Sequence, residues 1–234
     1  MRLRVSTILV TALLCLAPSA SWADLASYSQ DFEGLTPAPQ QLPETSLGDD
    51  GWLLFVNVFD ANGDFLYNYG NVFPAPNHGG AISAVVGGQG GLPQGAQQLS
   101  VFSDYNCCDL PNQGHGNGTD LVEMNVFINL IPSIPADDVG KTLTFSFDAK
   151  IGNLDGNTTA FAFIKTLDPA NNFDTTNNIT QQTDNIGDAW ARFEIELVID
   201  AGLEGQLLQV GFVNTASNFD GSGVFYDNLR VDLE

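Results

Sequence analysis

Apolar and polar residues alternate along much of this chain. From Leu143 to Ile151 every second residue is apolar, and residues 192–200 repeat the pattern, with Glu194 and Glu196 on the polar side. A period of two is that of a β-strand with one buried face. Nine further segments carry strand signals, at residues 27–32, 52–59, 65–69, 81–86, 98–102, 121–130, 160–167, 207–214 and 224–233.

Turn-forming residues separate these segments, and no periodicity of a long helix is present. Many short strands at this spacing are typical of a sandwich. The sequence therefore predicts an all-β protein, a two-sheet antiparallel β-sandwich of jelly-roll type, in one domain over residues 24–234. Residues 168–188, rich in Asn, Thr and Asp, are expected to form a long polar loop. Such a loop is either a binding loop or surface padding.

The segment from Asp60 to Asp64 has two interpretations. Asp60, Asn62 and Asp64 match the opening of a calcium-binding loop, but Phe65 stands where the EF-hand needs glycine. The Asn62-Gly63 pair between two strand segments is also a strong signal for a type I′ hairpin. The hairpin is the favoured prediction.

Residues 1–23 have the features of a secretory signal peptide. Arg2 and Arg4 precede an apolar run, and Ser21 and Ala23 place small residues at the −3 and −1 positions of a cleavage site. The apolar run is shorter than the ~20 residues that span a bilayer. We therefore expect a secreted protein, periplasmic or extracellular, with no membrane insertion.

The charge balance restricts the partners. The chain of 234 residues has 28 acidic and 7 basic residues and a formal net charge of −21. Nucleic acid would be repelled, because phosphate binding needs clustered Lys and Arg. The acidic surface favours solubility. It indicates either adaptation to a salty or calcium-rich exterior or carboxylates that bind divalent cations.

Asp227 stands out within the last strand segment. It shares parity with Phe225, Leu229, Val231 and Leu233, so the pattern predicts that its side chain points to the apolar face. A buried carboxylate needs a cation, a basic partner or dense hydrogen bonding. Basic residues are few, so calcium is one candidate partner, and hydrogen bonds at a strand end are the alternative.

Three motifs carry a family resemblance. They are residues 29–34 (Ser-Gln-Asp-Phe-Glu-Gly), Gly51-Trp52 and residues 225–231 (Phe-Tyr-Asp-Asn-Leu-Arg-Val). Together they resemble the carbohydrate-binding modules of the galactose-binding-like jelly-roll superfamily. The resemblance implies a structural calcium between the first and last strands, held by Glu33 and Asp227. It covers the two ends and the general strand pattern, and the central ligand-binding positions have no match.

Sugar binding needs aromatic faces for stacking and amide or carboxylate groups for hydroxyls. The aromatic candidates are Trp52, Tyr67, Tyr69 and Tyr105. Tyr67 and Tyr69 share one strand face, where they either line a surface or pack in the core.

Cys107 and Cys108 are adjacent and are the only cysteines beyond the signal peptide. Export favours their oxidation. Adjacent Cα atoms are ~3.8 Å apart, so a vicinal disulfide would be strained. Intermolecular pairing and a metal site with His115 are the alternatives.

The first hypothesis is an exported, calcium-stabilised, non-catalytic β-sandwich that binds a polysaccharide or other glycan. The second is an adhesion, surface or matrix protein that uses the same fold for protein contacts. The third is a glycan-degrading enzyme, for which Glu194 and Glu196 are the only paired carboxylates of note.

Overall fold

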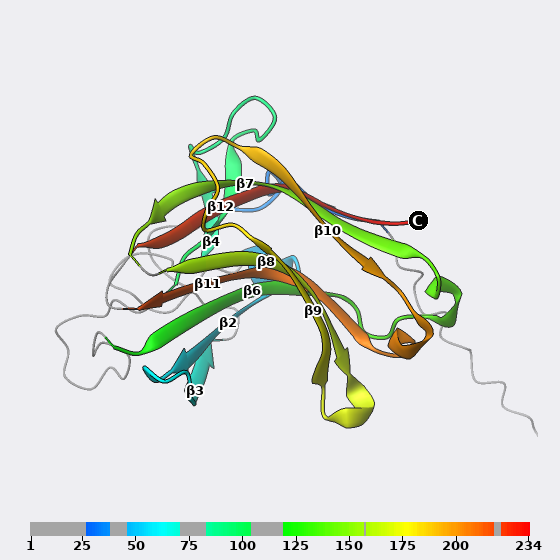
Figure 1. The fold of residues 1–234 in the computed structure, drawn as a ribbon. Helices are drawn as coiled ribbons and strands as arrows, with labels where there is room; N and C mark the ends of the chain where they lie inside the picture. Colours follow the sequence, from blue (N-terminus) through cyan, green and yellow to red (C-terminus); the bar gives the residue numbers. More distant parts are fainter. Residues whose placement is uncertain (1–26, 38–45, 71–82, 104–118, 157, 218–220) are drawn as a thin grey trace, which may run out of the picture.

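The computed structural model describes residues 27–37, 46–70, 83–103, 119–156, 158–217 and 221–234. These residues form a jelly-roll-type β-sandwich of two antiparallel six-stranded sheets (Figure 1). The predicted fold class is confirmed.

The first sheet, sheet A, has the strand order β10-β7-β12-β5-β4. Its sixth strand, β1, also pairs with β12. Its strands are β1 (Tyr28–Gln30), β4 (Ala84–Gly87), β5 (Gln97–Val101), β7 (Thr142–Leu154), β10 (Ala191–Val198) and β12 (Ser222–Leu233).

The second sheet, sheet B, has the order β3-β2-β6-β11-β8-β9. Its strands are β2 (Trp52–Phe59), β3 (Phe65–Gly70), β6 (Leu121–Ile131), β8 (Thr159–Asp168), β9 (Asp174–Gln182) and β11 (Leu207–Ser217). The described part also contains a short helix, α1 (Ser46–Asp49), and 3-10 turns at Ala136–Asp138, Pro169–Asn171 and Ala201–Leu203. None of the described helices has the length and apolarity to cross a membrane.

Aromatic side chains from both sheets meet in the core. Phe212 on β11 stacks on Tyr226 of β12, with ring centroids 3.7 Å apart. Phe145 and Phe147 of β7 also contact Phe212, at 5.8 and 5.4 Å. All four side chains are fully buried. Because apolar burial is the main favourable term in folding, this contact holds the two sheets together.

The alternating segments of the sequence all coincide with strands, but the predicted loop at residues 168–188 is wrong. It contains β9, which pairs with β8 and forms one edge of sheet B. Most of its side chains are polar because few of them face the core. The segment therefore lacks the alternating apolar residues that indicate a strand, and its composition resembles that of a loop.

The hairpin between β2 and β3 is confirmed, but its predicted turn type is wrong. The Gly63 amide donates to the Asp60 carbonyl and the Asp60 amide donates to the Asp64 carbonyl, which encloses three residues rather than two. Gly63 has a φ of 87° and Asn62 has no positive φ. The Asp60 carboxylate accepts from the amides of Asn62 and Asp64 at 2.8 and 2.9 Å, which lowers its pKa. The turn itself uses the carboxylate that a metal loop would need.

Candidate functional site

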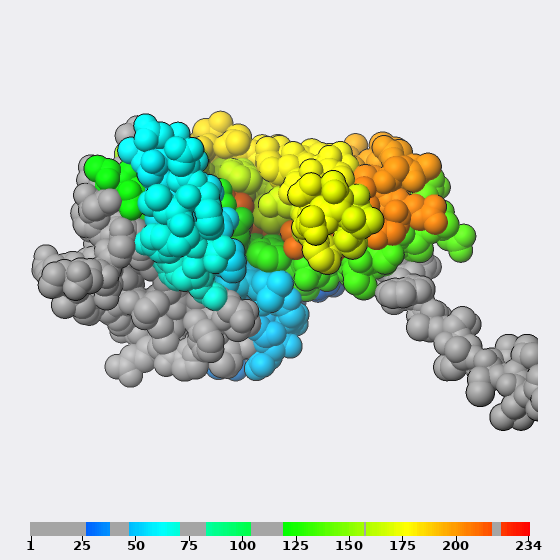
Figure 2. All heavy atoms as spheres, turned by 90° about the horizontal axis from the view of Figure 1, so that it is seen from below, coloured from blue at the N-terminus to red at the C-terminus, as the bar shows by residue number. Residues whose placement is uncertain are grey.

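Sheet B presents a hollowed face on the side away from sheet A. The buried side chains from Trp52 to Val58 on β2 point to the core, so Leu53, Phe55 and Asn57 point outward. Figure 2 looks onto this side and shows a hollow between the β2–β3 hairpin and the β8–β9 hairpin. We call the outward residues of β2, β6, β11, β8 and β9 the concave face.

An apolar band crosses the middle of the concave face. Strand register places Phe127, Gly211 and Phe163 in one row, and Phe55 and Phe161 lie in the next row along the strands. Phe163 is only 1% exposed although it points away from the core. Its neighbours on this face therefore enclose it, as expected for the floor of a groove.

Gly211 lets the strands approach closely at this floor. A Cβ atom at Gly211 would overlap the carbonyl oxygen of Val126 and lie 2.5 Å from Cβ of Phe127. Real side chains essentially never make contacts this short. Glycine at the centre of the face therefore permits the inward curvature of sheet B.

We expect Gly211→Ala to destabilise the protein by about 1–3 kcal/mol, because overpacking forces the surrounding backbone to move. Chemical denaturation monitored by Trp fluorescence measures this change. Gly205→Ala is the control for replacing a glycine outside the sheet: no atom lies within 4 Å of its added Cβ, although its positive φ carries a backbone cost. Equal stability of Gly211→Ala and wild type would contradict the close approach.

A hydrogen-bonded cluster of polar residues borders the apolar band. The side-chain amides of Asn57 and Asn125 both donate to Oε1 of Glu123, at 2.9 Å each. Within the described ranges, Oε2 of Glu123 and the Oδ1 atoms of both asparagines have no hydrogen-bond partner. Three acceptor atoms of outward residues are therefore available for a ligand. Asn68 and Gln182 add amides to these rows. Asn129, Gln209 and Asn178 form another amide row on the opposite side of the apolar band.

Lys165 lies on the opposite side of the apolar band from Glu123. Its Nζ atom is 4.6 Å from the ring centroid of Phe163. Burial lowers the pKa of Lys165 below its usual 10.5, and the charge of Glu123 opposes this with a smaller effect. The concave face thus combines aromatic rings, amides, one carboxylate and one ammonium.

The structure places the predicted sugar-binding aromatics elsewhere. Trp52 is fully buried against Phe212, so its prediction as a stacking residue is wrong. Tyr67 and Tyr69 do share a face, with ring centroids 6.4 Å apart, but they lie opposite Val58 and Val56 on the core side of sheet B.

Asp227 is buried, as predicted, but it does not point into the sandwich. Tyr226 faces the core, and Asp227 pairs with Asp148 on the outer side of sheet A. The strand register shifts between Asp227 and Arg230, and Asn228 there has a φ of 48°. This bulge returns Leu229 to the core side. The parity argument failed because it assumed an unbroken strand.

The Asp227 carboxylate is incompletely satisfied. Oδ1 accepts from the Asn228 amide at 2.6 Å, whereas Oδ2 is buried with no hydrogen-bond partner. The pKa of Asp227 is raised to about 7. Burial is the largest cause, the hydrogen bond from Asn228 opposes it, and the charges of Asp148, Asp31 and Glu33 add to it. A cation bound to Oδ2 would give this atom a partner and would stabilise the ionised carboxylate.

Glu33 lies in the turn after β1 and couples electrostatically to Asp227. Its Oε1 accepts from the amides of Ala96 and Gln97, at 2.7 Å each. The Gln97 side chain donates in turn to the carbonyls of Phe32, Glu33 and Leu35. No group of three or more His, Cys, Asp or Glu side chains in the described ranges has a metal-binding arrangement. Calcium also takes carbonyl oxygens, so the orphan Oδ2 of Asp227 and the carboxylate of Glu33 fit such an ion.

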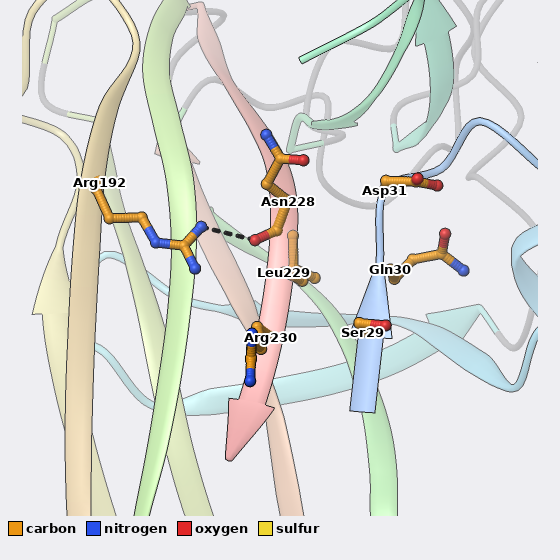
Figure 3. Close-up of a pocket in the computed structure, with 7 residues that line it drawn as sticks. All are labelled: Ser29, Gln30, Asp31, Arg192, Asn228, Leu229 and Arg230. Carbon is orange, nitrogen blue, oxygen red and sulfur yellow. Dashed lines mark hydrogen bonds between the residues drawn. The ribbon is translucent and has the colours of Figure 1, made fainter. Parts of the chain in front are cut away.

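A polar depression of about 410 Å³ adjoins Asp227 on the outer side of sheet A. Figure 3 shows Arg192 reaching across to the carbonyl oxygen of Asn228, a contact of 2.7 Å. Arg192 also pairs with Asp148 at 3.1 Å, and Arg230 pairs with Asp232 at 2.6 Å. Both guanidinium charges are thus balanced by protein carboxylates.

The remaining predicted residues divide into two groups. Tyr105, Cys107 and Cys108 lie outside the described residues, as does the predicted signal peptide. Glu194 and Glu196 are exposed on β10, opposite Ser146 and Thr144. They lie on sheet A, away from the concave face.

Sequence reasoning missed the concave face, although a signal was present. In the strand at residues 121–131 and in the strand at 159–168, the positions that face away from the core carry Phe127, Phe161 and Phe163 beside Glu123 and Asn125. An ordinary exposed face would alternate with charged or small polar residues. Aromatic residues on both sides of a strand indicate a second face that is enclosed or binds a ligand.

Comparisons with known proteins show wide structural similarity at low identity. No protein-family model matches the sequence, and no curated protein matches it. The enzymatically active domain of tailspike protein 4 of bacteriophage CBA120 is 13% identical with a TM-score of 0.43, and the match covers 79% of this chain and 20% of that chain.

Two further solved structures match over nearly their whole length. The CBM22-1 xylan-binding domain of Xyn10C from Paenibacillus barcinonensis is 13% identical with a TM-score of 0.42, covering 91% of this chain and 95% of that chain. An apo-form cyclase from Fischerella sp. is 14% identical with a TM-score of 0.46, covering 86% and 87%. Other carbohydrate-binding modules are also among the matches. A fold does not by itself determine a function, so the function has to come from the chemistry of the site.

Proposed function

We propose that this protein binds a polysaccharide on the concave face of sheet B, without catalysis. The observation that carries the proposal is the cluster of Glu123, Asn57 and Asn125 at the edge of an enclosed apolar band. Its free acceptor oxygens are held in place by hydrogen bonds within the cluster. Preorganised acceptors bind hydroxyl groups with little loss of side-chain entropy.

The two parts of the concave face suit the two sides of a sugar. Phe55, Phe127 and Phe161 are partly exposed and offer rings against which the apolar C–H faces of a sugar pack. The amides and Glu123 offer acceptors and donors for hydroxyl groups at the rim. A few polar groups around an apolar floor are the usual composition of a ligand site.

A calcium ion belongs to the proposed function as a structural element. Asp227 and Glu33 would hold it, together with nearby backbone carbonyls. The ion would tie β12 to the turn after β1 and compensate the buried charge of Asp227. The export signal expected at residues 1–23 agrees with a polysaccharide target outside the cell.

Glu123→Gln tests the site. Hydrogen bonds to a charged group contribute about 1.5–3 kcal/mol, so we expect a loss of affinity of roughly tenfold to a hundredfold. Calorimetry with a panel of soluble polysaccharides, in calcium, first finds a ligand and then compares the variant with wild type. Glu196→Gln, exposed on sheet A, is the matched control and should bind like wild type.

Thermal unfolding of both variants verifies that they fold. Undiminished binding by folded Glu123→Gln would exclude the concave face. The absence of binding to every polysaccharide in the panel would overturn carbohydrate binding itself and favour the protein-contact function.

A further inference from the structure

Lys165 places an ammonium group in the groove. It lies on β8 in register with Gln209 on β11, and its side chain extends over Phe163. No carboxylate of the described residues lies within salt-bridge distance of its Nζ atom. A partly buried ammonium with only a ring beneath it is incompletely compensated for its lost hydration.

Other basic residues of the chain are placed differently. Lys141 pairs with Asp138 at 2.6 Å, and Arg192 and Arg230 pair with Asp148 and Asp232. Lys150 also forms no salt bridge within the described ranges, but it lies on sheet A over the rings of Trp190 and Phe225. The chain has four acidic residues for each basic one. Lys165 therefore differs from the paired residues: within the described ranges it has no salt-bridge partner, and the charge of Glu123 offsets its desolvation only in part.

Building on the proposed function, we infer that the groove recognises a glycan with isolated anionic substituents, carboxylate or sulfate, and that Lys165 binds the anionic group. The position of Lys165 supports this. An anionic group beside its ammonium would form a charge-assisted hydrogen bond and replace the hydration that burial removes. The lowered pKa of Lys165 reflects the same incomplete compensation.

The arrangement of charges restricts how many anionic groups the ligand carries. Glu123 lies beyond the apolar band and would repel a second anionic group beside it. The overall charge of −21 likewise repels a densely charged polyanion. A mostly neutral chain with sparse acidic groups satisfies both conditions: its hydroxyls meet Glu123 and the amides, and one anionic group meets Lys165.

The test compares acidic polysaccharides with neutral forms of the same backbone. Glucuronoxylan and its carboxyl-reduced form make up one pair, and a sulfated galactan and its desulfated form make up the other. Calorimetry at 0.15 M salt measures wild type, Lys165→Met, Lys165→Arg and the control Lys150→Met. The two pairs distinguish a carboxylate from a sulfate.

We expect wild type to prefer the anionic member of one pair by roughly tenfold to a hundredfold, the range for a charge-assisted contact. Lys165→Met should lose this preference, so that it binds the two members of the pair with similar affinity. Lys165→Arg should retain part of it, and Lys150→Met should behave like wild type. Equal binding of both members, or a preference that survives in Lys165→Met, would overturn the inference while leaving glycan binding intact. Binding to no member of either pair would instead count against the proposed function.

Discussion

Replacing Asp227 by asparagine is expected to stabilise the protein in chelator at pH 8 and to abolish its stabilisation by calcium. The carboxylate is fully buried, its Oδ2 has no hydrogen-bond partner, and its pKa is raised to about 7. Without a cation, the ionised form is therefore unfavourable in the folded state. Asparagine keeps the shape and removes the charge.

The pH dependence has a definite sign. The folded protein binds the Asp227 proton more tightly than the unfolded chain, whose pKa is near 3.8. The contribution of Asp227 is therefore most favourable below pH 4, falls as the pH rises from 4 to 7, and stays low above pH 7. A change of one in pKa corresponds to about 1.4 kcal/mol, so the metal-free cost at pH 8 is on the order of 4 kcal/mol.

Calcium should stabilise wild type and leave Asp227→Asn unchanged, which narrows the difference in stability between the two proteins. A ligand that binds only the folded state stabilises it by about 2.7 kcal/mol at a concentration of one hundred times Kd. Thermal unfolding of wild type and Asp227→Asn, at pH 5 and pH 8 with chelator or calcium, measures all four conditions. Asp188→Asn, at an exposed position before β10, is the control.

Two outcomes would contradict this account. If Asp227→Asn is less stable than wild type in chelator at pH 8, the carboxylate has a compensating partner in the fold. If calcium raises the melting temperature of both proteins equally, the ion binds away from Asp227.

Truncating Trp52 is expected to cost stability and to leave glycan affinity unchanged. The indole is fully buried, stacks on Phe212 with centroids 6.4 Å apart, and donates from Nε1 to the Tyr28 hydroxyl at 3.1 Å. Trp52→Ala removes this packing and leaves a cavity, for which about 3–5 kcal/mol is typical. Trp52→Phe keeps most of the packing and loses the hydrogen bond, with an expected cost of about 1–2 kcal/mol.

Denaturant unfolding gives the stability of both Trp52 variants, and calorimetry gives the affinity of the folded Trp52→Phe protein. Phe161→Leu, on the concave face, is the comparison: we expect it to weaken glycan binding with a smaller loss of stability. Weaker glycan binding by Trp52→Phe together with normal binding by Phe161→Leu would indicate that Trp52, and not Phe161, contributes the aromatic contact.

The bulge at Asp227 shows where local pattern stops being informative. Alternation within one strand assigns faces only while the strand is regular. The register shift and the positive φ of Asn228 move Asp227 to the outer side of sheet A and return Leu229 to the core. A bulge depends on what the partner strands and the covering loop require, so its position cannot be obtained from the strand's own residues.

The sequence alone determined the fold class and most strand positions. These follow from local properties, because a period of two and turn residues act over a few positions. Only the tertiary structure decided which face is hollow, that Trp52 packs in the core, and that Glu123, Asn57 and Lys165 share one surface. These residues come from three strands far apart in the chain. Strand order and sheet curvature bring them together, and both arise from packing between distant segments.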